Sequence, residues 1–289
     1  MNKALIITTT SGILSQFELN NVRLLQEIGY QVHYATNFGV PIYEVKDETL
    51  RNMWVVLHHI SIEKNPFKIR KNIWALRELI RIIDREAISV VHCHNPNGGV
   101  LGRLAAVLSK RKPYVVYTAH GFHFFQGAPV KNWLFYYPVE KVLAKFSDII
   151  ITINHEDYTR ADKFHYKKDG GAALIPGVGV DLEKFYPLKE DEVHERDTLR
   201  IDIGIPEHAF HIVSAGEINK NKNHRVVIEA IAKLARSDIY YSICGEGPNR
   251  KNLETEIKKY GLSDRVFLQG YRNDMPKIWR TADISVFPS

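Results

Sequence analysis

Short apolar runs alternate with helix-patterned segments along almost the whole of this 289-residue chain. The apolar runs read as strands that are buried on both faces, and apolar residues recur at helical spacing in the segments between them. Strands that alternate with helices predict βαβ units and parallel sheets, so the expected fold class is α/β. The expected strands are residues 4–8, 32–35, 55–60, 90–93, 114–118, 148–153, 210–213, 239–244, 265–268 and 284–287.

Two of these strands lead into turns that suit a bound phosphate. The segment SAGEINKNKNH covers residues 214–224, and SICGEGPNR covers residues 242–250. In each, a glycine-containing turn with a lysine nearby joins the end of a strand to the start of a helical pattern. The free amides of a first helical turn and an ammonium group can converge on one anion there. Two such units in succession predict a nucleotide or nucleotide-sugar site in the C-terminal part of the chain.

The length of the chain and a turn-rich segment near residue 180 predict two domains. The segment IPGVGVDLEKFYP, residues 175–187, has prolines and glycines around a strand end and cannot continue a helix. We expect an N-terminal domain at 1–175, a linker at 176–200 and a second domain at 201–289. Because ligand-binding loops of parallel sheets follow strand ends, and the sequence stops just after an expected strand, we expect a C-terminally truncated form of a longer protein.

The composition describes a globular protein, with 45% hydrophobic and 25% charged residues. The N-terminus runs directly into a strand and no apolar run could span a bilayer, so neither a signal peptide nor a membrane helix is expected. Cys93 and Cys244 fall in expected strands and are predicted to be buried free thiols, which fits a reducing cytoplasm. No nucleic-acid-binding motif is present, so no nucleic acid partner is expected.

The expected helices differ in character. Residues 69–83 are amphipathic, whereas residues 133–146 are apolar on more than one face and are expected to be well buried. The net charge is +6, and basic residues gather at 64–85 and 110–112. Solvated helix faces are the simpler interpretation of these clusters. The alternative is peripheral association with anionic lipid headgroups or a lipid diphosphate at the inner face of the cell membrane, which each added charge would favour by about 1 kcal/mol.

The chain resembles family 4 glycosyltransferases over nearly its whole length. GEINKNKNHRVVIEAIAKL, from residue 216, is similar to that family's Gly-Arg-Leu…Lys segment, and the sequence from GEGPNR at residue 245 to the end is similar to the stretch that follows it. The likeness includes YTAHG at residues 117–121 and IPGVGVDLEKF at the expected domain boundary. The Gly-Glu and Asn-Lys-Asn form of the first motif is nearest to glycosyltransferases of capsule and exopolysaccharide biosynthesis.

The resemblance implies the GT-B architecture: two Rossmann-like domains with parallel sheets, the second of them incomplete here. It implies a retaining transfer of a hexose from a nucleotide sugar, with UDP as the expected nucleotide. The acceptor would be a lipid-linked saccharide in the assembly of a surface polysaccharide, and the enzyme would be cytoplasmic. The donor would bind mainly to the C-terminal domain and the acceptor to the N-terminal one. Neither a cofactor nor a metal is implied.

Matched residue by residue, the resemblance gives Lys222 the role of neutralising the donor diphosphate, a catalytic role because the leaving group gains charge in the transition state. Glu217 stands where many relatives have an arginine that grips the diphosphate. A carboxylate cannot do this, so either Lys220 or Lys222 does more of the work of gripping the diphosphate, or Glu217 has a structural role such as holding Lys222. The other implied donor-binding residues are Gly216, Gly245, Glu246, Gly247, Tyr271 and Arg272; a plain strand-to-helix turn with Pro248 at the helix start is the alternative for the second turn.

In the N-terminal domain, His120 follows a strand and matches a histidine that lines the family's cleft near the transferred sugar, so it is the second catalytic candidate. His123 is a further candidate on the acceptor side. Ser11 and Gly12 follow the first strand and could meet the donor phosphate or the acceptor. The sequence His92-Cys93-His94 suggests a metal site, but no third ligand is evident and the family needs no metal, so none is expected.

The family's Glu-x7-Glu pair, which holds the donor sugar and ribose, would follow directly after Ser289. Two alternatives remain beside the transferase: a non-catalytic GT-B partner subunit or binding module, and a nucleotide-sugar epimerase. An NAD-dependent oxidoreductase is not expected, because the first turn, TTTSGILSQF, lacks Gly-x-Gly-x-x-Gly.

Overall fold

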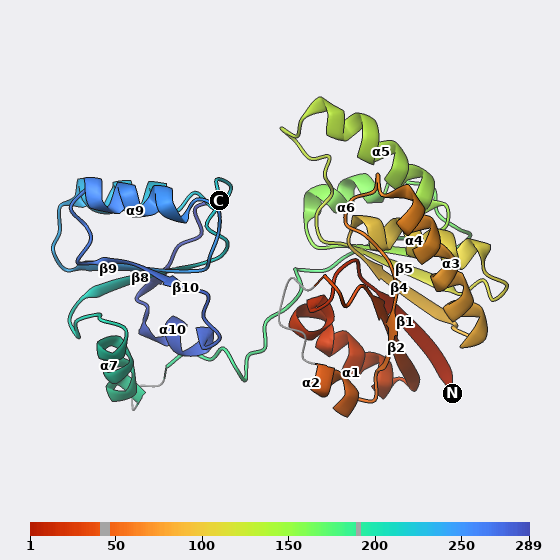
Figure 1. The fold of residues 1–289 in the computed structure, drawn as a ribbon, viewed down its shortest axis with the longest axis horizontal. Helices are drawn as coiled ribbons and strands as arrows, with labels where there is room; N and C mark the ends of the chain where they lie inside the picture. Colours follow the sequence, from red (N-terminus) through yellow and green to blue (C-terminus); the bar gives the residue numbers. More distant parts are fainter. Residues whose placement is uncertain (41–46, 189–191) are drawn as a thin grey trace. The chain divides into compact units, whose positions relative to one another are not determined.

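The computed structural model describes residues 1–40, 47–188 and 192–289. The chain forms two compact α/β units, Met1–Gly179 and Val180–Ser289, called unit 1 and unit 2 below (Figure 1). The division falls inside the residues 176–200 that were expected to link two domains, of which 189–191 lie outside the described residues. Helix α7 (Val193–Asp202) begins within this expected linker but packs against α10 (Met275–Thr281) of unit 2.

Unit 1 is built on a seven-stranded parallel sheet in the order β3-β2-β1-β4-β5-β6-β7. Its strands are β1 (Asn2–Ile7), β2 (Tyr30–Thr36), β3 (Val56–His59), β4 (Val90–His94), β5 (Tyr114–Ala119), β6 (Ile149–Thr152) and β7 (Gly171–Leu174). The strand order reverses between the neighbours β1 and β4. In open parallel sheets, ligands bind beyond the carboxyl ends of the strands at such a switch point.

Helices cover both faces of this sheet. One face carries a π-helical turn and two helices, η1 (Leu14–Glu18), α1 (Leu19–Glu27) and α2 (Asp47–Asn52). The other carries α3 (Ile69–Arg85), α4 (Pro96–Leu108), α5 (Val130–Ala144) and α6 (His155–Ala161). The strands therefore contribute apolar side chains to two separate cores, with Leu5 and Ile7 in one and Ile6 in the other. Successive side chains of a strand point to opposite faces, which explains this alternation.

Glycines let α4 approach the sheet closely. A Cβ added at Gly102 would lie 2.4 Å from Cys93 Sγ, and one added at Gly99 would lie 2.5 Å from the ring of Tyr117. Cys93 and Cys244 are both buried and free, as predicted. The close approach also brings Arg103 of α4 into the core, where the residue is fully buried.

Arg103 joins α4 to α5 through a buried ion pair. Its Nη2 lies 2.8 Å from Glu140 Oε2, and its Nε donates to the backbone oxygen of Gly99 at 2.8 Å. The guanidinium carbon lies 4.1 Å from the centre of the Tyr117 ring. Glu140 is only 6% exposed. The pairing therefore explains how an arginine and a glutamate are accommodated in an otherwise apolar layer.

The prediction that residues 133–146 are well buried is wrong for one side of α5. Trp133 and Tyr137 pack inward against the rings of Phe124 and Phe164. On the other side, Leu134 and Phe135 are 67% and 71% exposed. An apolar pattern on several faces shows that a helix is compatible with burial, but α5 has the sheet, α4 and α6 on one side only (Figure 1). Its opposite side is left uncovered by the described parts of the chain.

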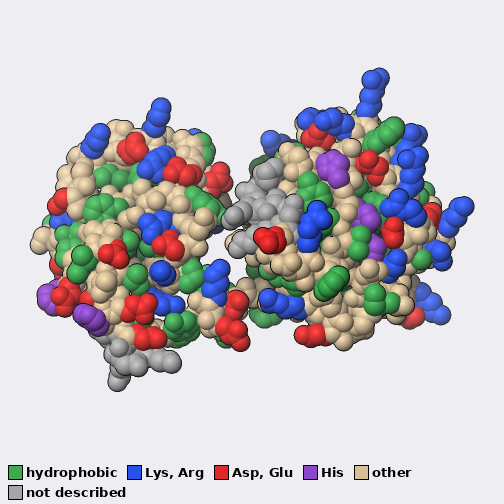
Figure 2. Space-filling view, turned by 60° about the horizontal axis from the view of Figure 1, so that its bottom comes forward, with side chains coloured by type: hydrophobic (Ala, Val, Ile, Leu, Met, Phe, Trp, Pro, Cys, Tyr) green, Lys and Arg blue, Asp and Glu red, His purple; other side chains and the backbone are tan. Residues whose placement is uncertain are grey.

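The basic clusters predicted from the sequence lie on α3, just before it, and in the loop after α4, and their side chains are exposed. Lys68 and Lys71 both pair with Glu63, at 3.1 and 2.7 Å. Figure 2 shows lysine and arginine side chains standing out around the rim of unit 1. Within the described ranges, none of the helices combines the length and the hydropathy needed to cross a bilayer.

Unit 2 has four parallel strands in the order β10-β9-β8-β11. They are β8 (Phe210–Ala215), β9 (Ile239–Cys244), β10 (Val266–Gly270) and the short edge strand β11 (Ile284–Ser285). One face is covered by α8 (Arg225–Leu234) and α9 (Arg250–Lys259), and the other by α7 and α10. The order reverses between β8 and β11, so the switch point of this sheet lies just beyond the end of β8.

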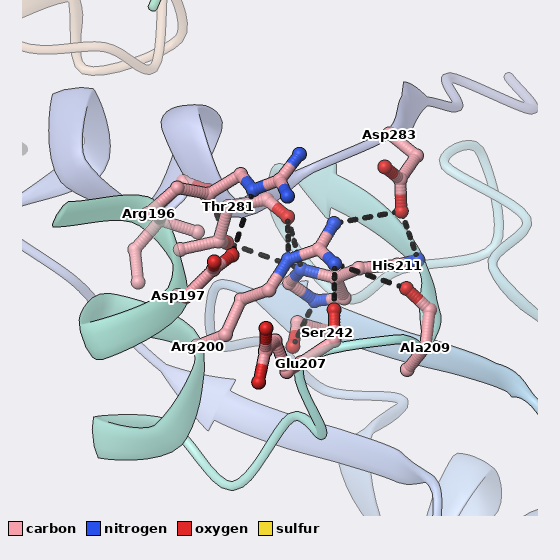
Figure 3. A network of polar contacts seen from close by, with 10 residues as sticks. Arg196, Asp197, Arg200, Glu207, Ala209, His211, Ser242, Thr281 and Asp283 are labelled. Carbon is pink, nitrogen blue, oxygen red and sulfur yellow. Dashed lines mark hydrogen bonds and ion pairs between the residues drawn. The ribbon is translucent and has the colours of Figure 1, made fainter. Parts of the chain in front are cut away.

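Arg200, near the end of α7, is the centre of a buried polar network in unit 2 (Figure 3). The side chain is 2% exposed. It donates to three backbone oxygens and pairs with one carboxylate: Thr281 O at 2.9 Å, Glu207 O at 2.9 Å, Ala209 O at 3.1 Å and Asp283 Oδ2 at 2.7 Å. The same Asp283 oxygen accepts from the His211 amide at 2.7 Å. One guanidinium thus holds α7, the start of β8 and the α10–β11 connection together.

Candidate functional site

In unit 1, two histidines meet beyond the carboxyl ends of neighbouring strands. His94 ends β4 and His120 directly follows β5, and their Nδ1 and Nε2 atoms lie 3.1 Å apart. Glu18, the last residue of η1, brings its Oε1 to 3.4 Å from His94 Nδ1 and 3.9 Å from His120 Nε2. This cluster, Glu18–His94–His120, sits by the β1–β4 switch point, where a parallel sheet binds ligands.

Burial determines the charge of the cluster. His94 is fully buried, and burial, followed by the nearness of His92 and His120, holds the pKa of His94 well below its usual range. Burial also lowers the pKa of His120 and raises that of Glu18 to about 7. The imidazoles are therefore neutral at pH 7, whereas the Glu18 carboxyl is close to half-protonated. Two neutral rings 3.1 Å apart share one hydrogen bond, with one nitrogen donating and the other accepting.

The cluster sets two further metal-type ligands, Glu18 and His120, beside His94, whereas the sequence had suggested His92 and His94 as the pair. One donor atom from each of its three residues lies within 4.8 Å of the others, so the three could surround a metal ion. A ligating imidazole normally donates its second N–H to a fixed partner. His94 Nε2 is buried and has no hydrogen-bond partner among the described residues. The arrangement therefore fits a hydrogen-bonded cluster better than a metal centre. His92 is outside it and bonds to Thr118 Oγ1 at 2.8 Å.

The Glu18 carboxyl is expected to make folding stability depend on pH. Because the pKa of Glu18 is about 7 when folded and 4.5 in its ordinary state, the folded protein holds this proton more tightly than the unfolded chain does. The resulting stabilisation is present below about pH 4.5 and is lost as the pH rises through about 7. Relative to Glu18→Gln, which has no proton to lose, the wild type should lose up to about 3 kcal/mol of unfolding free energy between pH 4.5 and 8.

This effect is measured by urea unfolding of both proteins at a series of pH values. The buried histidines destabilise the folded state only as the pH falls below their ordinary value, and they do so in both proteins. They therefore cancel in the difference. A difference in unfolding free energy that stays constant from pH 4.5 to 8 would contradict the raised pKa of Glu18.

The residues that directly follow His120 in the sequence line a pocket of 430 Å³. It is formed by the loop after β5 and the start of α6 and is lined by Gly121, Phe122, His123, Phe125, Asn132, Asn154, Glu156 and Asp157. The Asp157 carboxylate accepts from the Phe122 amide at 3.0 Å, and Asn154 caps α6 by accepting from the Asp157 amide at 2.8 Å. His123 therefore lines a pocket whose lining includes none of the residues Glu18, His94 and His120. Asn154 and Asp157 were missed, although an Asn that follows a strand and precedes an acidic first turn is a helix-start signal.

Ser11 and Gly12 are buried in the turn between β1 and η1. Ser11 is 0% exposed, and its Oγ has no hydrogen-bond partner among the described residues. Gly12 has φ 88°, a conformation that favours glycine. Both predicted residues thus shape the turn that leads to Glu18. No described contact joins either of them to His120.

In unit 2, three glycines bring the ends of neighbouring strands into contact. The Gly216 amide donates to Cys244 O at 2.9 Å, and the Gly245 amide donates to Gly270 O at 2.7 Å. A Cβ at Gly245 would lie 2.0 Å from Gly216 O, and one at Gly247 would lie 2.4 Å from Ile218 O. Side chains at Gly245 and Gly247 would collide with backbone. Backbone packing is therefore sufficient to explain why glycine occupies these positions in the turns that were predicted to hold phosphate.

Lys222 lies over the first of these turns. Its Cε is 3.6 Å from the point that a Cβ of Gly216 would occupy. Its backbone amide donates to Asn219 Oδ1 at 2.9 Å, and Asn219 Nδ2 donates to Glu217 Oε2 at 2.8 Å. Glu217 thus supports Lys222 through Asn219, and no ion pair between Glu217 and Lys222 is present in the described structure. The Lys222 ammonium has no ion-pair partner among the described residues, which leaves its charge available to an anion.

The other predicted donor residues are not all gathered around Lys222. Lys220 lines a pocket of 440 Å³ with Asn223, Asn249 and Asn252 among its walls, and Lys222 is not part of that lining. Glu246 pairs with Arg250 at 2.9 Å.

The predicted base-binding loop follows β10. Tyr271 is 64% exposed, and the Arg272 guanidinium binds both oxygens of Asp274, at 2.8 and 2.6 Å. This pairing raises the pKa of Arg272 further, mainly through the hydrogen bonds to Asp274. Because the Arg272 guanidinium is already bound to the Asp274 carboxylate, Tyr271 and the backbone of this loop are better placed than Arg272 to contact a base.

Two α/β units with parallel sheets are the architecture expected of the GT-B class of folds. Solved structures share this fold at low sequence identity. HepE of Anabaena, crystallised with UDP and glucose, matches with a TM-score of 0.75 and 15% identity over 99% of this chain and 73% of its own. WaaG, a glycosyltransferase of lipopolysaccharide biosynthesis, matches with a TM-score of 0.69 and 15% identity over 99% of this chain and 75% of its own. The predicted fold class is thereby confirmed.

Sequence comparison identifies the family. Residues 4–154 match the family described as glycosyl transferase 4-like, and residues 195–289 match glycosyl transferases group 1. EpsD of Bacillus subtilis (strain 168), named as a glycosyltransferase, is 37% identical over 99% of this chain and 72% of its own length. An Escherichia coli UDP-Gal:alpha-D-GlcNAc-diphosphoundecaprenol alpha-1,3-galactosyltransferase is 28% identical over 96% of this chain and 70% of its own. The chain belongs to the family 4 glycosyltransferases, as predicted, and its enzyme class is glycosyltransferase rather than epimerase.

Proposed function

We propose that this glycosyltransferase transfers a hexose from a UDP-sugar to a lipid-linked saccharide, with retention of configuration, in surface polysaccharide assembly. The observation that carries the proposal is the Lys222 ammonium, which lies over the Gly216 turn without an ion-pair partner among the described residues. The named activity of the Escherichia coli relative, with its UDP-linked donor and diphosphoundecaprenol-linked acceptor, supports the choice of both substrates. The complex of HepE with UDP and glucose supports the choice of nucleotide.

The proposed chemistry divides between the two units. As the bond from the sugar C1 to the UDP oxygen breaks, its electron pair passes to the diphosphate, and Lys222 stabilises that growing charge. The acceptor hydroxyl oxygen forms the new bond to C1 on the face from which UDP leaves, and its proton passes to the departing phosphate. His120, neutral and 27% exposed, is the most exposed member of the cluster and is therefore the one we assign to contact with the sugar or the acceptor. No metal or cofactor takes part in the proposed reaction.

The place of action follows from the proposed acceptor. A lipid-linked saccharide keeps its lipid in a bilayer, so the enzyme would work at the cytoplasmic face of the cell membrane as a peripheral protein. Two buried free cysteines are compatible with a reducing compartment. No nucleic acid is expected as a partner.

A donor screen by calorimetry on the complete protein tests the proposal. UDP should bind more tightly than ADP or GDP, and one UDP-hexose should support transfer to a diphosphoundecaprenol-linked sugar. The anomeric configuration of the product, read by NMR, should match that of the donor. Binding of ADP or GDP in preference to UDP, or an inverted product, would contradict the proposed donor or mechanism.

His120→Ala should impair transfer and leave nucleotide binding nearly intact. His120 belongs to unit 1, whereas the proposed diphosphate ligand Lys222 belongs to unit 2. Loss of a hydrogen bond to the sugar or acceptor, worth about 1–3 kcal/mol, should lower kcat/KM by roughly 10- to 100-fold. UDP affinity, measured by calorimetry, should stay within about twofold.

The matched comparison for this variant is His123→Ala, because His123 lies in the neighbouring pocket but outside the Glu18–His94–His120 cluster. A His120→Ala protein that loses UDP binding as severely as it loses transfer would show that His120 acts on the nucleotide. A larger loss in His123→Ala would transfer the assigned role to that residue.

A further inference from the structure

His94 and His120 share one hydrogen bond, and the direction of that bond decides what His120 offers to a ligand. His94 Nδ1 and His120 Nε2 lie 3.1 Å apart, where β4 ends and directly after β5. We propose that His94 is a positioning residue: its Nδ1–H donates to His120 Nε2 and thereby holds His120 as an Nδ1–H donor toward an oxygen of the sugar or the acceptor. The inference rests on the proposed function only for the identity of that oxygen.

Two arrangements of protons fit this pair of rings. Burial keeps both imidazoles neutral, and a neutral imidazole has one N–H and one bare nitrogen. In the first arrangement, His94 Nδ1 donates and its Nε2 is bare, so His120 accepts at Nε2 and carries its proton on Nδ1. In the second, His120 Nε2 donates to a bare His94 Nδ1, and His94 carries its proton on Nε2. The two arrangements differ in the nitrogen that each ring leaves for other contacts.

The unused nitrogen of His94 favours the first arrangement. His94 is 0% exposed, and its Nε2 has no hydrogen-bond partner among the described residues. In the second arrangement this nitrogen would be a buried N–H without an acceptor, whereas in the first it is a bare acceptor. Buried N–H groups without a partner are rarer than buried acceptors without one, and each costs the desolvation of a donor. His94 is therefore assigned a proton on Nδ1.

Glu18 independently favours the same arrangement. Glu18 is 2% exposed, and its Oε1 lies 3.4 Å from His94 Nδ1. In the second arrangement, the lone pairs of a bare nitrogen and a carboxyl oxygen would face each other in a buried site. In the first, the oxygen faces the positive end of an N–H bond. Protonation of Glu18 does not reverse this preference, because the single lone pair of Nδ1 could not accept from Glu18 and from His120 together.

The first arrangement leaves the Nδ1–H of His120 as the group that meets a ligand. The His120 side chain is 27% exposed, and its Nδ1 forms no hydrogen bond with any residue that the structure describes. A neutral N–H donates to a sugar oxygen but takes no proton from it. His120 would therefore orient the sugar or the acceptor and would not act as a general base, which agrees with the proposed passage of the acceptor proton to the departing phosphate. His94 is fully buried and sets this role without contact to the substrate.

¹⁵N NMR of the complete protein, recorded at neutral pH without donor or acceptor, tests the tautomer directly. Correlations from the ring nitrogens to the carbon-bound ring protons distinguish Nδ1–H from Nε2–H, and each ring is assigned by the loss of its signals in His94→Leu or His120→Ala. Both rings should carry the proton on Nδ1. In His94→Leu, which removes the donor, His120 should shift toward the Nε2–H form. His94→Asn has an amide nitrogen that can donate from near the position of Nδ1, so His120 should keep the Nδ1–H form.

Transfer kinetics test the consequence of the tautomer. His94→Leu should lower kcat/KM by roughly 3- to 10-fold, because His120 then spends part of its time with a bare Nδ1, whereas His94→Asn should stay within about twofold of wild type. Added to His120→Ala, the His94→Leu change should lower kcat/KM no further, because the ring that it positions is gone.

The matched control is His92→Leu, two residues earlier on the same face of β4. His92 is buried as well, but it bonds to Thr118 Oγ1 at 2.8 Å and not to His120. This control should keep the Nδ1–H form of His120 and a kcat/KM within about twofold of wild type. Urea midpoints show whether each variant is folded.

The wild-type spectrum alone can overturn the proposal, since a His120 in the Nε2–H form would reverse the direction of the bond. A His94→Leu protein in which His120 keeps the Nδ1–H form would show that His94 does not set the tautomer. An equal loss of kcat/KM in His92→Leu, or a further loss when His94→Leu is added to His120→Ala, would reduce His94 to a structural role. Because the spectra are recorded without substrates, a wrong donor or acceptor leaves them unchanged, and the two failures are distinguishable.

Discussion

Lys222→Ala should lower the turnover of sugar transfer by about 10²- to 10³-fold while the free energy of unfolding changes little. The reason is that the Lys222 ammonium lies over the Gly216 turn and has no ion-pair partner among the described residues, so its removal breaks no ion pair of the described fold. The charge that it is proposed to stabilise is larger in the transition state than in the bound donor. The loss should therefore appear in kcat as well as in kcat/KM.

Steady-state kinetics with the best donor of the screen measure this effect, and urea unfolding measures stability. Lys220→Ala is the matched control, because Lys220 lines a pocket with Asn223 and Asn249 to which Lys222 does not contribute. It should lose much less activity. Equal losses in the two variants would show that the diphosphate is held by a general positive field, and unchanged kinetics in Lys222→Ala would refute the assignment of that residue.

Arg103→Met should destabilise unit 1 by about 3–5 kcal/mol, because it leaves Glu140 as an unpaired carboxylate in the core. Arg103 is fully buried, and its Nη2 lies 2.8 Å from Glu140 Oε2. Methionine keeps much of the apolar contact with the Tyr117 ring but supplies no donor. Urea unfolding followed by tryptophan fluorescence can report this change, since Trp133 packs in the same layer against Phe124 and Tyr137.

The double variant Arg103→Met, Glu140→Leu separates the loss of the ion pair from the cost of the stranded charge. Replacement of both members of a buried pair by apolar residues is often close to neutral. The double variant should therefore recover most of the stability that the single variant loses. A double variant as unstable as the single one would show that the loss of stability comes from altered packing geometry and not from the uncompensated charge of Glu140.

The strands and the glycine turns could be predicted because their causes are local. An apolar run followed by a glycine turn specifies a buried parallel strand and its exit, and Gly216, Gly245 and Gly247 lie in such turns. Lys222 could be placed beside the first turn for the same reason, as it follows that turn within a few residues. The support of Lys222 by Asn219 is local as well, but hydrogen-bond geometry decides it, and the sequence predicted no role for Asn219.

The residues that the sequence did not reveal are brought together by the fold over long separations. Glu18 meets His94 and His120 from 76 and 102 positions away, because the order of β1, β4 and β5 places their carboxyl ends side by side. Nothing near Glu18 in the sequence marks it as a partner of histidines. The exposed side of α5 was mispredicted for a related reason. Whether an apolar helix is covered on its second side depends on which element packs there, and periodicity does not contain this information.

The Arg200 network couples the stability of three segments of unit 2: α7, residues 207–211 at the start of β8, and the α10–β11 connection. The guanidinium satisfies carbonyl oxygens and a carboxylate from segments as far apart as residues 207 and 283, all of them near the ends of secondary-structure elements. If α7 frays, these acceptors lose a common donor at once, and Asp283, which precedes the edge strand β11, keeps only the hydrogen bond from the His211 amide. Local opening of any one of these segments is thereby coupled to the others, so this side of unit 2 behaves as a single cooperative unit against unfolding.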